Sequence, residues 1–347
     1  MKSRALQFAT LAATCTVLTA CGAGNDQTRD QIRTVGSSTV YPFAKAVADS
    51  VAKSNPGIKS PIIESTGTGA GMKLFCAGVG AQHPDVVNAS RRMKASEYET
   101  CAKNGVKDIV EIQVGLDGLA FAEAKGGVGM DLTLADVYKA LAANPFGKPQ
   151  TAKTWKDVNP ALPAMPILVY GPPSTSGTRD SLKELVLIKG CETDPAMKAL
   201  KDSDKEKYEV TCTAVRSDGA YVDAGENDNL IVQKLEANPK AIGIFGFSYL
   251  EENADKLKGL KMNGVEPTYE TVSSFSYPGA RAMFIYVKAA HLSAIKGLKE
   301  FVAEWPKQWG RDGMLARLGM VVSPDDVQAA NAQIASEATL LDPTQLK

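Results

Sequence analysis

The chain has 347 residues and balances 39 lysines and arginines against 39 aspartates and glutamates. This zero formal charge, without a long basic run, excludes the electrostatic footprint of a nucleic-acid-binding protein. Only the N-terminus carries a long apolar stretch, so no later segment is expected to cross a bilayer. The length suits two domains of ordinary size.

The N-terminus has the pattern of a secretory signal with a lipid-attachment motif. Two cations precede an apolar stretch, which ends in the sequence LTAC at residues 18–21. This layout predicts a lipoprotein signal peptide over residues 1–20, with Cys21 as the lipid-carrying first residue of the exported chain. The alternative is plain cleavage, with no role for Cys21. Residues 21–30 are mostly small or polar and are expected to form a flexible tether.

Four cysteines remain in the exported chain, and they fall into two neighbouring pairs. An even number of cysteines in an exported protein indicates disulfides. Four cysteines allow three pairings, and closeness in sequence favours Cys76–Cys101 and Cys191–Cys212. Metal binding is the alternative. Because the chain has no Cys-x-x-Cys motif and only two histidines, no metal site is expected.

The first part of the exported chain repeats a strand, a loop and a helix. Short β-prone runs predict strands at residues 32–35, 61–64 and 85–89. A helix is predicted after each strand, beginning near Val40, Met72 and Ser96. A further buried strand is predicted at residues 109–114, followed by an extended segment at residues 118–122.

A glycine pair at residues 126–127 marks the expected crossing into a second domain. Helices are predicted there at residues 134–141, 182–186 and 229–235, and strands at residues 167–170 and 241–245. An apolar strand at residues 282–287 is expected to return to the first domain, where a C-terminal helix packs. This alternation implies parallel sheets with ligand loops at the strand carboxyl ends. The domains are predicted to cover residues 31–124 plus 275–347, and residues 125–274.

Three loops share one composition and one position, between a strand and a helix. They read GSST at residues 36–39, STGTG at residues 65–69 and SGT at residues 176–178. A helix N-terminus offers unpaired N–H groups and partial positive charge, glycine lets the backbone approach a ligand, and hydroxyls donate hydrogen bonds. Together the loops predict an oxyanion site, although each alone is also typical of an ordinary helix cap or turn.

The predicted ligand residues come from these loops and from the end of the third strand. They are Ser37, Ser38, Thr39, Ser65, Thr66, Gly67, Ser90, Arg91, Ser176, Gly177, Thr178 and Arg179. The two arginines could make paired bonds to a tetrahedral anion, or could form surface ion pairs, as Arg179 could with Asp180 or Glu184. Behind them we expect four carboxylates that accept a ligand proton or orient the arginines, with solvated loop positions as the alternative. These are Asp117, Asp180, Glu226 and Asp228.

The same residues do not predict an enzyme. A serine nucleophile needs a nearby base, but neither His83 nor His291 lies in these loops. Lys183 could serve Ser176 only from the second turn of an amphipathic helix, where we expect it to face solvent. The glycine-rich loop before Lys73 lacks the Gly-Lys-Ser/Thr of a nucleotide-binding loop. The chain is therefore predicted to bind its ligand without chemistry, cofactor or metal.

Six segments of the chain resemble, in order and spacing, the periplasmic phosphate-binding proteins of the Pst ABC transporter, the PstS family. They are VGSSTVYPF, ESTGTGAGMKLFCAG, DVVNASRRM, VGLDGLAF, STSGTRDSL and NPKAIGIFGFSYL. The resemblance runs from about Thr34 to about Arg281 and so covers most of the exported chain.

The resemblance implies an α/β periplasmic-binding-protein fold of two lobes. Each lobe would be a mainly parallel sheet flanked by helices, and crossing strands would join the lobes, which close on phosphate. It implies a periplasmic protein, expected to be a monomer and held to a membrane only by its lipid, that hands inorganic phosphate to permease subunits. By the same resemblance, the residues expected to bind phosphate are Ser38 or Thr39, Ser65 or Thr66, and residues 176–178.

Two positions depart from the family pattern. Some members have Ala-Ser-Asp, whose aspartate accepts a proton from bound phosphate, where this chain has ASR at residues 89–91; other members also resemble Ala-Ser-Arg. An arginine that precedes the Ser-Gly-Thr triplet in some relatives is absent, two prolines occupy residues 172–173, and Arg179 is the candidate substitute. A binding protein for sulfate, molybdate or a phosphonate, and an exported phosphohydrolase, are therefore the alternatives.

Overall fold

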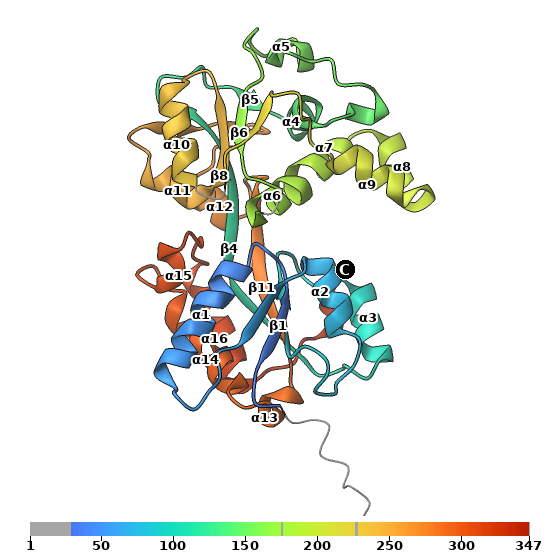
Figure 1. Ribbon diagram of the computed structural model, residues 1–347, viewed down its shortest axis with the longest axis vertical. Helices are drawn as coiled ribbons and strands as arrows, with labels where there is room; N and C mark the ends of the chain where they lie inside the picture. The colour runs from blue at the N-terminus through green and yellow to red at the C-terminus, as the bar shows by residue number, and fades with distance from the viewer. Residues whose placement is uncertain (1–28, 175, 226–227, 347) are drawn as a thin grey trace, which may run out of the picture.

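The computed structural model describes residues 29–346, apart from residues 175, 226 and 227. The predicted signal peptide, the lipid site at Cys21 and the tether up to residue 28 lie outside these residues. Figure 1 shows two bodies of helices and strands, connected by the long strands β4 (Ile109–Ala124) and β11 (Ala280–Lys288). We call the lower one in this view the N-terminal body and the upper one the central body. None of the described helices is long and apolar enough to span a membrane.

The N-terminal body places three parallel strands beside β11. They are β1 (Arg33–Gly36), β2 (Ile62–Ser65) and β3 (Val86–Ala89). A helix follows each strand, in the order α1 (Tyr41–Ser54), α2 (Thr68–Phe75) and α3 (Ala95–Lys103), so the predicted repeat is confirmed. The end of the chain adds α13 (His291–Ala294), α14 (Leu298–Gln308), α15 (Met314–Arg317), α16 (Asp325–Glu337) and a 3-10 turn (Pro343–Gln345).

The central body contains three further parallel strands, β6 (Val169–Gly171), β7 (Tyr221–Asp223) and β8 (Ile242–Gly246). β9 (Leu257–Gly259) pairs with β4, and β5 (Asp131–Leu132) pairs with β10 (Lys261–Met262). The helices are α4 (Leu134–Leu141), α5 (Trp155–Val158), α6 (Gly177–Ser181), α7 (Ile188–Cys191), α8 (Pro195–Ser203), α9 (Lys205–Thr213), α10 (Asp228–Ala237), α11 (Phe247–Glu252) and α12 (Tyr269–Ser273). A π-helical turn (Leu182–Leu187) joins α6 to α7, and a 3-10 turn covers Pro145–Gly147.

One continuous mixed sheet runs through both bodies, in the order β2-β1-β3-β11-β4-β8-β6-β7. This corrects the expectation of a separate, mainly parallel sheet in each lobe, because β11 is antiparallel to β3 and β4, and β4 is antiparallel to β8. The cause is the length of β4. Its 16 residues span roughly 50 Å at the usual rise of a strand, so the segments predicted at residues 109–114 and 118–122 form one strand that serves both bodies.

The sheet of the N-terminal body buries apolar side chains on both faces. Val86 and Val87 are neighbours on β3 and point to opposite faces, because strand side chains alternate. Val86 packs in a core with Val47 of α1 and Trp305 of α14, whereas Val87 packs in a second core with Phe75 of α2. With both faces covered, the parallel strands are held firmly, and their carboxyl ends share one edge.

Both predicted disulfides are present. Cys76–Cys101 joins the end of α2 to α3, and Cys191–Cys212 joins α7 to α9. In Figure 1 the helices α2 and α3 of the N-terminal body lie across from α8 and α9 of the central body. The two disulfides therefore brace two helical walls that belong to different bodies.

Candidate anion-binding site

The carboxyl ends of β1 and β2 hold the first two predicted loops together. Gly36 ends β1 with φ at +128°, and a Cβ there would lie 2.1 Å from the backbone oxygen of Asn88, so the position requires glycine. The carbonyl oxygen of Gly36 accepts hydrogen bonds from the N–H groups of Thr66 and Gly67, both at 2.8 Å. These two N–H groups therefore have protein partners already.

Thr68 and Ser90 join the second loop to the third strand. Thr68 begins α2, and its Oγ1 accepts a hydrogen bond from the N–H of Ser90 at 3.1 Å and lies 3.0 Å from Ser90 Oγ. Both residues are buried. In the same loop, Thr66 Oγ1 is buried and has no hydrogen-bond partner in the described part of the chain. Because an unpaired buried hydroxyl costs free energy, Thr66 is a candidate ligand contact.

The Ser-Gly-Thr loop reaches the same place from the central body. Gly177 opens α6, and a Cβ there would lie 2.6 Å from the backbone N and the Cα of Thr39. Thr39 Oγ1 donates to the carbonyl oxygen of Gly177 at 3.1 Å, and Ser38 Oγ donates to the carboxylate of Asp180. The loops of the two bodies are thus in direct contact.

Ser176 caps its own helix. Its Oγ accepts a hydrogen bond from the N–H of Thr178 at 3.1 Å, so the helix-cap alternative describes this hydroxyl correctly.

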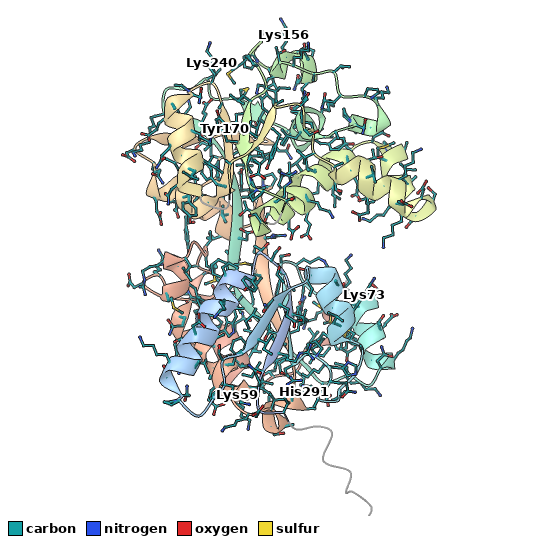
Figure 2. The ribbon with its side chains drawn as sticks, viewed as in Figure 1. Lys59, Lys73, Lys156, Tyr170, Lys240 and His291 are labelled. Carbon is teal, nitrogen blue, oxygen red and sulfur yellow. A yellow bond between two sulfur atoms is a disulfide. The ribbon has the colours of Figure 1, made fainter. Side chains whose placement is uncertain are left out.

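The two histidines lie far from Ser176. Figure 2 labels His291 at the lower end of the N-terminal body, where its Nδ1 lies 2.6 Å from Asp85 Oδ1. Arg29 bonds to the carbonyl oxygen of His83 in the same cluster. Neither imidazole can therefore act as a base for Ser176.

A buried arginine absent from the predicted ligand set, Arg281 of β11, lies where the loops meet. Its side chain is only 6% exposed. Its Nη2 donates to Thr39 Oγ1 at 2.7 Å and to Ser181 Oγ at 2.5 Å. Its Nε donates to Asp117 Oδ2 at 2.9 Å, and its Nη1 donates to Glu184 Oε2 at 2.7 Å. One guanidinium therefore connects the first loop, the crossing strands and the helix behind the Ser-Gly-Thr loop.

One sequence signal could have indicated Arg281. It is a cation within a strand that is otherwise largely apolar, and a buried charge needs partners. The helix after Gly177 supplies two of them, because Ser181 and Glu184 are three residues apart and both contact the guanidinium. Glu184 lies in the π-helical turn, a feature that is frequent at functional sites.

Carboxylates outnumber cations around these loops. Asp117 and Glu184 both bond to Arg281, and Asp180 bonds to the first loop. Glu184 Oε2 also lies 3.5 Å from Ser90 Oγ. One guanidinium and three carboxylates therefore contact the meeting point of the loops, which gives it an excess of negative charge.

The two arginines predicted as ligands bind other partners in this structure. Arg91 forms a paired bond with Glu97, at 2.9 and 2.7 Å. Burial alone would raise the pKa of Glu97, but the hydrogen bond from Arg91 helps to hold that pKa below its ordinary value. Arg179 donates to the carbonyl oxygen of Pro172 at 3.1 Å and stacks on the ring of Tyr221, 4.5 Å from its centroid.

Most of the predicted loop residues surround one cavity of about 470 Å³, which we call the inner cavity. Its lining includes Ser38, Thr39, Ser65, Asp117, Ser176, Gly177 and Thr178. Ser37 is buried, and its N–H donates to the carbonyl oxygen of Asn88 at 3.0 Å. Glu226 and the side chain of Asp228 lie outside the described residues.

The inner cavity has the chemistry of an oxyanion site. Gly67, the N-cap residue of α2, makes no side-chain cap bond, so the N-terminus of α2 offers N–H groups and partial positive charge to an anion. At α1 the N–H of Tyr41 already donates to the carbonyl oxygen of Ser37, and Pro42 has no N–H. Arg281 lies beside this cavity and donates to two residues that line it, Thr39 and Asp117. Among the described residues, no group of three His, Cys, Asp or Glu side chains could hold a metal ion.

Known proteins share this sequence over most of its length. A family model described as a PBP superfamily domain matches residues 22–305. The protein SphX of Synechococcus elongatus is 34% identical over 309 residues, which cover 86% of this chain and 79% of that protein. The phosphate-binding protein PstS of Staphylococcus haemolyticus is 30% identical over 341 residues, which cover 94% of each chain. The chain belongs to the PstS family.

A solved structure agrees with membership of the PstS family. The crystal structure of a possible phosphate binding protein from Planctomyces limnophilus is 29% identical, with a TM-score of 0.71, and the match covers 89% of this chain and 98% of that chain. The predicted resemblance to PstS is thereby confirmed. The names of these PstS relatives describe binding rather than catalysis, in agreement with the expectation that the chain is not an enzyme.

Proposed function

We propose that the protein binds inorganic phosphate in the inner cavity and delivers it to the permease of an ABC transporter. One observation carries the proposal: a hydroxyl from each body, Thr39 Oγ1 and Ser181 Oγ, contacts the buried guanidinium of Arg281 beside a cavity that residues of all three loops line. The PstS relatives, which are named for phosphate binding, support the choice of ligand. Hydrolysis has less support, because neither histidine is near Ser176.

The proposed phosphate contacts come from the three loops, from the end of β3 and from Arg281. They are Ser38, Thr39, Ser65, Thr66, Ser90, Gly177, Thr178 and Arg281. Three predicted residues, Ser37, Gly67 and Ser176, instead shape the loops through their own hydrogen bonds. Arg91 and Arg179 would contact phosphate only after leaving Glu97 and Tyr221.

The carboxylates support selectivity for a protonated anion. An ionised carboxylate accepts hydrogen bonds and cannot donate them, so a ligand oxygen that meets Asp117 or Glu184 must carry a proton. Phosphate keeps a proton at neutral pH, whereas sulfate has none. We therefore propose that Glu184, 3.5 Å from Ser90 Oγ, takes the acceptor role that the family aspartate plays after the equivalent serine.

Replacing Glu184 with glutamine should weaken the preference for phosphate over sulfate. The amide of glutamine can donate a hydrogen bond to a fully ionised oxygen, so the ratio of the two affinities should fall about tenfold, which corresponds to one hydrogen bond to a charged group. Calorimetric titration with each anion measures this ratio. Glu300→Gln, on the exposed face of α14, is the matched control, and an unchanged ratio in Glu184→Gln would refute the assignment.

We propose that the two bodies are two lobes that close on phosphate. One lobe covers residues 31–124 plus 275–347, and the other covers residues 125–274. The crossing strands β4 and β11 support hinge motion, because they are the long connections between the bodies (Figure 1), and loops from both sides complete the cavity. Small-angle scattering should show a smaller radius of gyration with phosphate, and an unchanged radius would refute closure.

We propose that the protein is exported and anchored through Cys21 after removal of residues 1–20. The two disulfides support an oxidising compartment such as the periplasm. Arg29 pairs with Ile295 after α13, at the end of the N-terminal body that lies away from the loops in Figure 1. A tether that leaves there keeps the inner cavity accessible to a permease. Incorporation of labelled palmitate, lost in Cys21→Ser, tests the anchor, and no incorporation in the parent refutes it.

Titration calorimetry of the purified protein with inorganic phosphate tests the ligand. Saturable heat at one site and a higher melting temperature are expected, because a ligand of the folded state stabilises that state. Sulfate, molybdate and a phosphonate serve as competitors that should bind more weakly. Turnover of an aryl phosphate would instead support the phosphohydrolase alternative, and tighter binding of another oxyanion would replace phosphate as the ligand.

A further inference from the structure

A second and larger hollow separates the two bodies on the side of α8 and α9. It has a volume of about 690 Å³, and its walls belong to α2 and α3 on one side and to α8 and α9 on the other. We call it the outer cleft. Gly69, in the first turn of α2, and Arg91, next to Ser90, line it. The outer cleft therefore adjoins the second loop and the end of β3 in the proposed phosphate site.

Cations dominate the lining of the outer cleft. Its charged side chains are Lys73, Arg91, Lys94, Lys201 and Lys205, against Glu97 and Glu209. The carboxylates are paired, Glu97 with Arg91 and Glu209 with Lys183. Lys73 and Lys205, from opposite walls, are exposed and have no ion-pair partner among the described residues. The outer cleft therefore carries an excess of positive charge.

The disulfides hold these cations in place. Cys76, at the end of α2, is bonded to Cys101 of α3, and this wall carries Lys73. Cys212 of α9 is bonded to Cys191, and this wall carries Lys205. Figure 2 shows Lys73 on the edge of the N-terminal body that faces the central body. The positive charge thus lies on two braced walls rather than on loose loops.

The inner cavity presents the opposite sign to an arriving anion. Asp117 is the one charged side chain in its described lining, and Arg281 beside it is bonded to both Asp117 and Glu184, while Asp180 bonds to Ser38. Before phosphate forms short hydrogen bonds with Arg281, this excess of negative charge repels it over about a Debye length, which is roughly 8–10 Å near physiological salt. The carboxylates that favour a protonated anion should therefore also slow the entry of phosphate into the inner cavity.

We propose that the outer cleft is an encounter site that attracts phosphate and guides it to the inner cavity. The proposal rests on phosphate being the ligand. Charge of one sign within a cleft raises the local concentration of an oppositely charged ligand, and hence its association rate, by tenfold or more. Lys73 and Lys205 supply this attraction without being contacts of the bound anion. They set the rate of capture, whereas Arg281 and the loops set the affinity after capture.

Stopped-flow measurement of inorganic phosphate binding tests this role. In the double variant Lys73→Glu/Lys205→Glu the association rate constant at low ionic strength should fall about tenfold or more, with little change in the dissociation rate constant. The rate for the parent protein should fall as salt rises, and that of the variant should not. The matched control is Lys156→Glu/Lys240→Glu, which makes the same change in net charge at the far end of the central body (Figure 2).

The outcomes separate this proposal from the proposed function. If the parent binds phosphate and the two double variants associate at the same rate with the same salt dependence, the outer cleft has no steering role and the function stands. If both variants slow equally, net charge and not the outer cleft is responsible. If the parent gives no calorimetric binding to phosphate, the proposed function fails and this proposal fails with it.

Discussion

Replacing Arg281 with alanine should reduce phosphate affinity by at least about a hundredfold. The substitution removes the buried guanidinium that bonds to Thr39 and Asp117 of the inner cavity, and it leaves Asp117 and Glu184 facing one another without their cation. Truncating one partner of a buried, hydrogen-bonded charge pair at a binding interface costs about 2–5 kcal/mol or more of binding free energy, and each tenfold change in affinity corresponds to about 1.4 kcal/mol. Titration calorimetry gives the affinity directly.

A second variant keeps this prediction informative if Arg281→Ala folds poorly. Arg281→Lys preserves the charge but loses the planar fork, so it should fold and bind phosphate roughly tenfold more weakly. Arg311→Ala is the matched control, because Arg311 is exposed and stacks on Tyr269. Melting curves without phosphate report folding. A folded Arg281→Ala variant with the affinity of the parent would show that phosphate binds elsewhere.

Replacing Gly177 with alanine should also weaken phosphate binding, by roughly ten- to a hundredfold. The added Cβ would lie 2.6 Å from the backbone of Thr39, and backbone cannot move aside as a flexible side chain can. Overpacking of this kind costs about 1–3 kcal/mol. Because the clash is between the two bodies, their separation relieves it. The melting temperature without phosphate should therefore stay close to that of the parent.

Gly126→Ala is the control for this variant. Gly126 lies in the turn after β4, and a Cβ there has no neighbour within 4 Å, so phosphate affinity should not change. Calorimetry and melting curves of both variants complete the comparison. Equal affinities in Gly177→Ala and the parent would mean that the contact between Gly177 and Thr39 is not part of the phosphate-bound state.

The three loops could be predicted because the sequence pattern that indicates each of them is local. Short apolar strands followed by Gly, Ser and Thr and then by a helical period appear within about twenty residues of sequence, and parallel strands bring their carboxyl ends to one edge. The disulfides followed for the same reason, since each joins neighbouring cysteines, 25 and 21 residues apart.

The partners of Arg281 could not be predicted because they are distant in the chain. Arg281 lies 242 residues from Thr39, 164 from Asp117 and 97 from Glu184, and no local pattern relates such positions. Arg91 shows how a partner near in sequence can compete with a predicted ligand. It follows a site serine directly, but a glutamate six residues later, Glu97, binds its guanidinium, and sequence alone does not decide between these partners.

The single mixed sheet was missed for a related reason. Residues 109–124 contain glycines at positions 115 and 118, which divide the apolar pattern into two apparent segments. Both positions are tightly packed, since a Cβ would lie 2.4 Å from Met320 at Gly115 and 2.7 Å from Phe247 at Gly118. The glycines are there for close packing within one strand, not to end it.

A crystal structure of the protein with inorganic phosphate, in crystals free of sulfate, tests the central claim most directly. The account predicts a tetrahedral anion in the inner cavity, within about 3 Å of the guanidinium nitrogens of Arg281, with contacts from the first two loops and from the loop that contains Gly177. Phosphate bound with high affinity anywhere else, or bound in the inner cavity without contact to Arg281, would contradict it.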